Sequence, residues 1–147
     1  MTLQQLCVPL EMAKKLRTLG VAKESFASWY YHDRHKEWTL LINGQFDVPK
    51  STQKLYPAYT SGELGEMLPY ESGMKFFSTY YNDHIGAWYC EYRGFKASGE
   101  HESFDWSAGI PPPLIHETEG DTESECRGEM IEYLIESGSL TVDEVNK

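Results

Sequence analysis

The sequence predicts an α+β fold, in which one antiparallel sheet of about four to five strands is built from two hairpins and covered by helices on one face. Three observations predict this class. Two pairs of aromatic, β-prone segments are each joined by a short polar connector, as in hairpins. Amphipathic segments with capping residues precede, separate and follow these pairs. The 147 residues suffice for one buried core, so we expect a single domain spanning residues 1–147.

Residues 8–20 predict the first helix, because Pro9 lies in its first turn and Gly20 follows its last. The apolar residues recur at helical spacing and form one stripe, made of Leu10, Ala13, Leu16 and Leu19. We expect this stripe to pack against the rest of the protein.

Residues 26–31 and 37–42 predict the first hairpin, since both segments are rich in β-prone residues and only five polar residues separate them. Asn43 and Gly44 then form a strong turn signal. We therefore expect a further short strand around residues 45–48 and a loop over residues 49–59.

Thr60 and Glu63 match the capping-box pattern and predict a short second helix over residues 61–68. Gly62 and Gly65 weaken this helix by about 1 kcal/mol each relative to alanine, so tertiary packing must stabilise it. The apolar residues available for that packing are Leu64, Met67 and Leu68.

Residues 74–81 and 85–93 predict the second hairpin, with its turn at residues 82–84. Alternation along its second strand places one set of side chains toward the core, namely Trp88, Cys90 and Tyr92. It places the other set on a wetter face, namely Ala87, Tyr89, Glu91 and Arg93. Residues 94–117 are expected to be irregular, with the prolines stiffening residues 110–114.

Thr122 and Glu125 match a second capping box and begin the last long helix, which ends before Gly138. One side of this helix is apolar and consists of Cys126, Met130, Ile131, Leu134 and Ile135. The other side carries four glutamates, Glu125, Glu129, Glu132 and Glu136. Thr141 and Glu144 repeat the capping pattern for one closing turn.

Acidic residues are concentrated in the last third of the chain. The net charge of the whole chain is −10. Residues 1–99 contain 11 Lys or Arg and 10 Asp or Glu, whereas residues 100–147 contain 2 and 13. Phosphate binding needs clustered cations, so we expect no direct nucleic-acid binding. The acidic region fits either a solvated helix face or a surface that approaches a basic region of a partner protein.

The sequence lacks the motifs that are typical of membrane proteins, secreted disulfide-rich proteins, zinc proteins and nucleotide-binding enzymes. No apolar run approaches the roughly 20 residues of a membrane span, and no secretory signal is present, so we expect no membrane association and a cytoplasmic location. The three cysteines fit neither a disulfide framework nor a zinc motif. No phosphate loop or dinucleotide fingerprint is present. We predict no catalytic residue and no cofactor.

His32 and His35 lie three residues apart in the connector of the first hairpin, with Asp33 between them. Helical metal sites hold two imidazoles at i and i+4 on one face, but a three-residue spacing in a turn imposes no such geometry. We therefore interpret this cluster as a turn and predict no metal site.

Aromatic residues are the strongest remaining signal, with 10 Tyr, 6 Phe and 4 Trp. Rings and arginines dominate binding hot spots, although core packing accounts for many of the rings. The candidate binding residues are Trp29, Tyr31, Arg34, Trp38, Tyr89 and Arg93, together with Glu125, Glu129, Glu132 and Glu136 of the last helix. Tyr80 and Trp106 belong to the same aromatic inventory.

Four segments, residues 10–20, 56–69, 87–90 and 121–138, resemble a group of small uncharacterised proteins from bacteriophage and prophage genomes of gut bacteria. They occur in the same order and cover about half of the chain. The resemblance implies a viral or mobile-element origin and favours roles in host interaction. It implies no particular catalytic or binding residue.

Two hypotheses from different classes follow. The first is a non-enzymatic phage accessory protein, for host interaction or counter-defence, that binds a partner protein through the acidic helix and an aromatic sheet face. The second is a small-ligand or nucleotide-binding protein, or a small hydrolase, that stacks a ring between Trp and Tyr and holds a phosphate with Arg34, Arg93 or His84. Self-association through a free sheet edge is compatible with either.

Overall fold

The computed structural model describes residues 1–45, 55–69, 71–72, 75–94 and 113–147. The helices formed by these residues are α1 (Leu3–Leu6), α2 (Leu10–Thr18), α3 (Ser61–Met67), α4 (Glu123–Glu136) and α5 (Val142–Asn146). The strands are β1 (Ala27–His32), β2 (Glu37–Ile42), β3 (Leu55–Pro57), β4 (Glu71–Ser72), β5 (Lys75–Asn82), β6 (Ala87–Arg93) and β7 (Leu114–Gly120). The predicted α+β class is confirmed.

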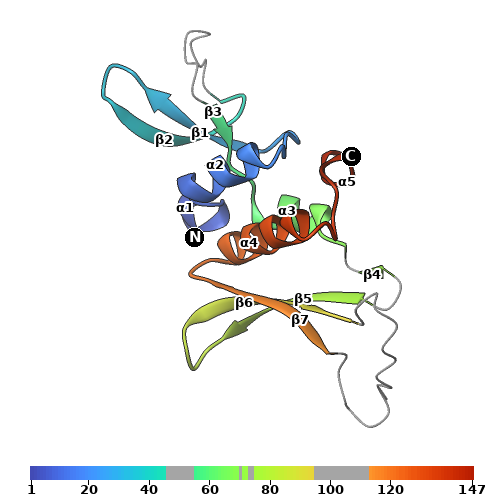
Figure 1. The fold of residues 1–147 in the computed structure, drawn as a ribbon. Helices are drawn as coiled ribbons and strands as arrows, with labels where there is room; N and C mark the ends of the chain where they lie inside the picture. Colours follow the sequence, from blue (N-terminus) through green and yellow to red (C-terminus); the bar gives the residue numbers. More distant parts are fainter. Residues whose placement is uncertain (46–54, 70, 73–74, 95–112) are drawn as a thin grey trace.

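The strands form two sheets, so the prediction of one sheet is wrong. Sheet 1 has the order β2-β1-β3, and sheet 2 consists of β5, β6 and β7 with the two-residue strand β4 at its edge. All pairings are antiparallel. The helices lie between the two sheets (Figure 1). The hairpins do not pair with each other because each one covers a different side of the helices.

Helix α4 is the centre of the core. It contacts β6 and β7 on one side and α1, α2 and α3 on others. Met130, Ile131 and Leu134 are fully buried in it, and each such side chain stabilises the fold by about 1.5–3 kcal/mol. Gly128 permits the close approach of α2, since a Cβ there would lie 2.8 Å from Cγ of Met12. None of the helices in the described part of the chain is long and apolar enough to cross a bilayer.

The predicted helix ends are mostly confirmed. Thr60 and Thr141 each form a complete capping box, with Glu63 and Glu144 respectively. The predicted box at Thr122 forms only in part. Its hydroxyl accepts from the Glu125 amide at 3.2 Å, but the Glu125 carboxylate accepts from the amide of Asp121 instead.

Both hairpins are confirmed, but four elements were missed. Helix α1 and the two-residue strand β4 were not predicted, β3 lies in the expected loop at 49–59, and β7 overlaps the expected irregular region at 94–117. β3 has only three residues, and β7 directly follows three prolines. Neither strand carries a strong pattern of alternating apolar and polar residues. The strand expected at 45–48, apart from residue 45, lies outside the described residues, as do Trp106 and most of 110–114.

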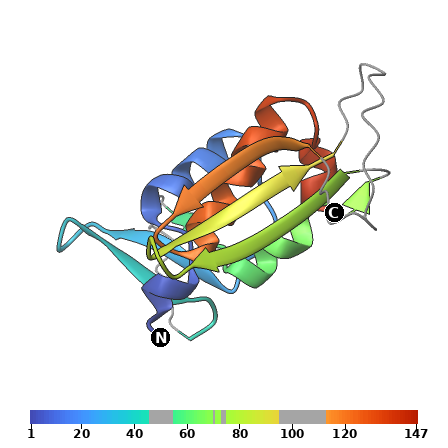
Figure 2. The ribbon, with the colours of Figure 1, turned by 90° about the horizontal axis from the view of Figure 1, so that it is seen from below.

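Sheet 2 has one face against the helices and one face that no described helix covers (Figure 2). The second face is called the open face of sheet 2. Cys90 and Tyr92 point toward the helices and are buried, as predicted. On the opposite face, Tyr89 is only 9% exposed, although alternation predicted a wetter environment. On this face its ring stacks on that of Tyr80, and its hydroxyl donates to Glu119.

Candidate functional site

The structure distributes the predicted binding residues over four places. Trp29, Tyr31 and Trp38 lie on the face of sheet 1 that meets the helices, and Arg34 lies in the turn between β1 and β2. The remaining residues belong to the other half of the protein. They are Tyr89 and Arg93 on the open face of sheet 2, and Glu125, Glu129, Glu132 and Glu136 on α4.

The aromatic residues of sheet 1 attach that sheet to the helices. The indole N–H of Trp29 donates to the carbonyl oxygen of Val8 at 2.9 Å. The ring of Trp38 lies 5.4 Å from that of Tyr31 and 5.5 Å from that of Tyr56, centroid to centroid. The Lys14 ammonium lies 5.5 Å from the centroid of the Trp38 ring, within the range of a cation–π contact. Most of these ring surfaces therefore serve packing.

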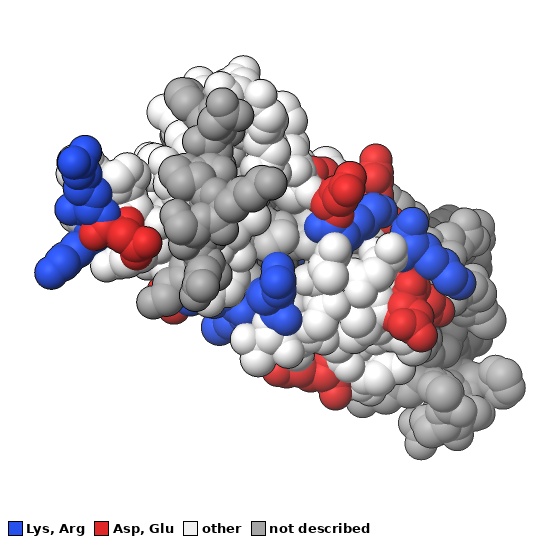
Figure 3. Space-filling model, turned by 90° about the horizontal axis from the view of Figure 1, so that it is seen from above, with Lys and Arg blue, Asp and Glu red and all other residues white. Residues whose placement is uncertain are grey.

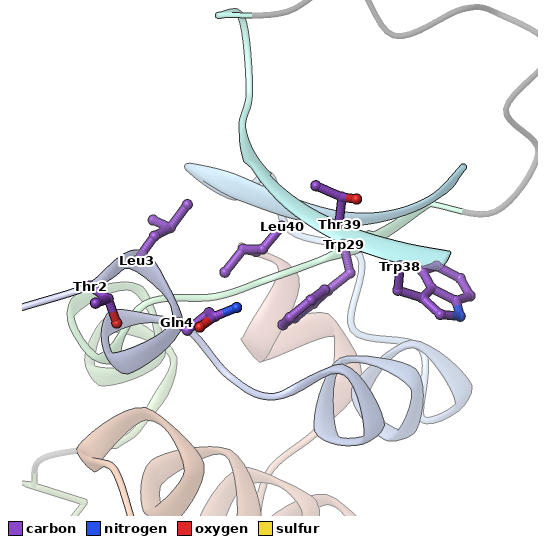
Figure 4. Close-up of a pocket in the computed structure, with 7 residues that line it drawn as sticks. All are labelled: Thr2, Leu3, Gln4, Trp29, Trp38, Thr39 and Leu40. Carbon is purple, nitrogen blue, oxygen red and sulfur yellow. The ribbon is translucent and has the colours of Figure 1, made fainter. Parts of the chain in front are cut away.

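A small hollow nevertheless lies beside these rings, between α1 and sheet 1 (Figure 4). Its volume is about 270 Å³, and its lining residues are Thr2, Leu3, Gln4, Trp29, Trp38, Thr39 and Leu40. The two indoles and two leucines form apolar walls, and the polar groups are neutral amides and hydroxyls. Neither Arg34 nor Arg93 lines it, so the arginines do not join the tryptophans as the phosphate-holding hypothesis requires.

The open face of sheet 2 carries a network of tyrosines and carboxylates. The rings of Tyr80 and Tyr89 stack at 5.5 Å with an angle of 15° between their planes. The Tyr89 hydroxyl donates to the Glu119 carboxylate at 3.0 Å, and this hydrogen bond raises the pKa of Tyr89. The Tyr80 hydroxyl donates to Glu91 at 3.3 Å. Of these residues, only Tyr89 was a candidate from the sequence.

Glu91 and Glu117 face each other across β6 and β7 as directly paired residues. Nε of Arg93 donates to Glu91 at 2.8 Å, and this bond lowers the pKa of the Glu91 carboxyl. Burial, together with the neighbouring Glu91, raises the pKa of Glu117. Glu117 is therefore the first of the two to take up a proton as the pH falls.

Three glutamates of α4 line a second hollow, which opens between α4, α2 and β7. Its volume is about 320 Å³, and its lining residues are Lys15, His116, Thr118, Glu129, Glu132, Tyr133 and Glu136. Burial raises the pKa of Glu129, and the charges of Glu125 and Glu132 raise it further. Nζ of Lys15 lies 3.6 Å from Glu132. Glu125 differs from the other three because it caps the start of the helix.

His116 connects this hollow to β7. Its ring stacks on that of Tyr133 with a centroid distance of 3.6 Å and an angle of 6°. Burial lowers the pKa of His116, so the imidazole is neutral at pH 7 and adds no positive charge to the hollow. The hollow is therefore acidic, and Lys15 is the one cation among the described residues that line it.

The carboxylates near β7 form two groups on opposite faces of sheet 2. Glu91, Glu117 and Glu119 lie on the face away from the helices, and Glu129, Glu132 and Glu136 lie on the helix side. Glu117 and Glu119 pair with Glu91 and Tyr89 and so project to the open face. Thr118 projects to the helix side, where its hydroxyl donates to the carbonyl oxygen of Cys126 at 2.8 Å. The sequence did not predict that carboxylates lie on both sides of this strand, because most of β7 falls in the region expected to be irregular.

The histidines and cysteines show no catalytic arrangement among the described residues. The rings of His32 and His35 lie 4.5 Å apart, and no third carboxylate, thiol or imidazole in the described part of the chain joins them as a metal ligand. All three cysteines are buried. Burial raises the pKa of Cys7 to about 11, which leaves its thiol protonated and poorly nucleophilic at pH 7.

No protein-family model, curated protein or solved structure matches the chain.

Proposed function

We propose that this protein is a non-enzymatic binding module that holds a basic segment of a partner protein. The binding region, here called the β7 acidic surface, comprises Glu91, Glu117 and Glu119 on the open face of sheet 2 and Glu129, Glu132 and Glu136 on α4. The observation that carries the proposal is that these two groups flank one edge strand of the sheet. Cations on a partner could contact both groups at once.

The charge distribution over the molecule supports this location. On the face that carries sheet 1, Lys and Arg alternate with Asp and Glu in small separate areas (Figure 3). The β7 acidic surface instead gathers six carboxylates around one strand, where Arg93 pairs with Glu91 and Lys15 with Glu132. Complementary potential speeds encounter with a basic partner and orients it. Tyr80, which is 41% exposed, adds a ring against which a lysine or arginine side chain can pack.

The resemblance to phage and prophage proteins favours a partner from the host cell or the phage. A role in host interaction or counter-defence accords with a small acidic binding protein, because recognition of a partner is sufficient for such a role. This part of the proposal rests on the resemblance alone.

Binding to a labelled peptide of alternating lysine and threonine tests the proposal. Fluorescence anisotropy should show that the protein binds this peptide in preference to one of alternating glutamate and threonine, and that salt weakens the binding. The triple variant Glu117→Gln, Glu119→Gln, Glu136→Gln should weaken the affinity by about tenfold or more.

A matched triple variant separates the surface from net charge. Glu24→Gln, Glu37→Gln and Asp143→Asn remove the same charge from exposed positions elsewhere and should change the affinity by less than about twofold. Equal losses in both variants, or no preference for the basic peptide, would contradict the proposal.

The hollow between α1 and sheet 1 favours a second candidate function, the binding of a small ring-shaped ligand. Its two indoles offer stacking surfaces, and its uncharged lining favours a neutral ring such as a nucleobase over a phosphate group. Tryptophan fluorescence during titration with nucleosides would test this. Quenching that disappears in Trp38→Ala but persists in Tyr81→Ala supports it, and unchanged fluorescence with every nucleoside contradicts it.

A further inference from the structure

We infer that the basic segment binds as an added β-strand along the outer edge of β7 and extends sheet 2. This inference rests on the proposed function and specifies how the partner is held. It also specifies the partner's chemistry, which is an extended segment with lysine or arginine at alternate positions and small or β-branched uncharged residues between them.

Within the described part of the chain, β7 is an edge strand of sheet 2. Sheet 2 has the order β4-β5-β6-β7, and β6 is the only strand that pairs with β7 among the described residues. In an antiparallel ladder, alternate residues of an edge strand direct their N–H and C=O groups outward. β7 is seven residues long, which is enough for several such groups. Main-chain hydrogen bonds to an added strand would satisfy them.

The side chains of β7 define what the added strand must carry. Residues opposite Glu117 and Glu119 would share their side of the sheet, so cations at those alternate positions meet both exposed carboxylates. The intervening residue lies beside Thr118, which is 7% exposed under α4. On that side the hollow between α4, α2 and β7 has a volume of about 320 Å³, which admits a small or β-branched uncharged residue, and Glu129, Glu132 and Glu136 add negative potential there.

The same charges select against self-association. Natural edge strands are often protected by lysine, proline or a covering loop, but β7 contains neither lysine nor proline. Two copies paired edge to edge through β7 would bring carboxylates of one copy close to those of the other, which is repulsive. A basic segment replaces that repulsion with attraction. The edge therefore favours a basic strand over a second copy of this chain.

Backbone methylation of the peptide tests strand addition without changing charge. Two versions of the lysine–threonine peptide carry N-methyl groups on every lysine or on every threonine. In an added strand, one set of amides faces β7 and the other faces away. One methylated peptide should therefore lose affinity by about tenfold or more, while the other keeps most of it.

The outcomes distinguish the two proposals. Equal affinities of the two methylated peptides would overturn strand addition and leave the proposed function standing. Failure of the unmodified peptide to bind would contradict the proposed function itself. Hydrogen exchange gives an independent readout, since the bound peptide should slow the exchange of amides in 114–120 and leave those of β2, an edge of sheet 1, unchanged. No added protection in 114–120 would also overturn strand addition.

Discussion

Sheets 1 and 2 have a similar construction, but sheet 2 also carries a stacked pair of aromatic rings on the face turned away from the helices. Each consists of a hairpin and a third strand from a distant segment, and the helices lie between the two sheets. In sheet 1, Trp29 and Trp38 face the helices and attach the sheet to them. In sheet 2, Tyr80 and Tyr89 face away from the helices, among carboxylates. Aromatic content alone therefore does not identify a binding surface, because its role depends on which face meets the helices.

The largest expected effect is a loss of stability. It should be greater for a substitution in the core around α4 than for one in sheet 1. Leu134→Ala removes a fully buried side chain of α4 and should lower the free energy of unfolding by about 2–5 kcal/mol. Leu40→Ala removes the same atoms from a half-buried position in sheet 1 and should cost about 1–2 kcal/mol. Urea denaturation measures both. Equal losses would contradict the view that α4 is the centre of the core.

An intermediate effect contrasts the two aromatic faces directly. Trp38→Ala removes ring contacts with Tyr31 and Tyr56 and should destabilise the protein by about 1–3 kcal/mol. Tyr80→Ala, on the open face, should change stability by about 0.5 kcal/mol or less but weaken binding of the lysine–threonine peptide. Thermal unfolding and anisotropy measure the two properties. The opposite pattern would assign the binding role to sheet 1.

The smallest expected effect concerns the acidic hollow beside sheet 2. Because the pKa of Glu129 is raised in the folded protein, its contribution to stability is present at low pH and is lost as the pH rises through that pKa. Glu129→Gln removes the buried charge, so the variant should be more stable than the parent at pH 7, and this difference should shrink at pH 4. Urea midpoints at both pH values test this. A Glu24→Gln control, at an exposed site, should show no such pH dependence.

Local signals predicted the parts of the fold that depend on neighbouring residues. The capping boxes at Thr60 and Thr141 each need only a residue three positions later, and the structure contains both. Both hairpins likewise join segments separated by a few polar residues. Strands β3 and β7 escaped prediction because each pairs across a long stretch of chain, and a short or charged strand has no strong pattern of its own.

The candidate site shows the same division. The glutamates of α4 were identified from helical spacing, and in the structure Glu129, Glu132 and Glu136 line one hollow. The spacing could not show that Glu125 caps the helix, that Glu91 and Glu117 face each other, or that β7 lies between the two acidic groups. These facts depend on strand pairing.

The sequence by itself determined the secondary-structure class, the positions of the caps and hairpins, and the excess of acid in the last third of the chain. These depend on local backbone preferences and on composition. Only the tertiary structure decided that the hairpins form separate sheets, that α4 is buried between them, and that carboxylates from three elements surround β7. The physical reason is that burial and long-range pairing are shared among distant segments, so no single segment specifies them.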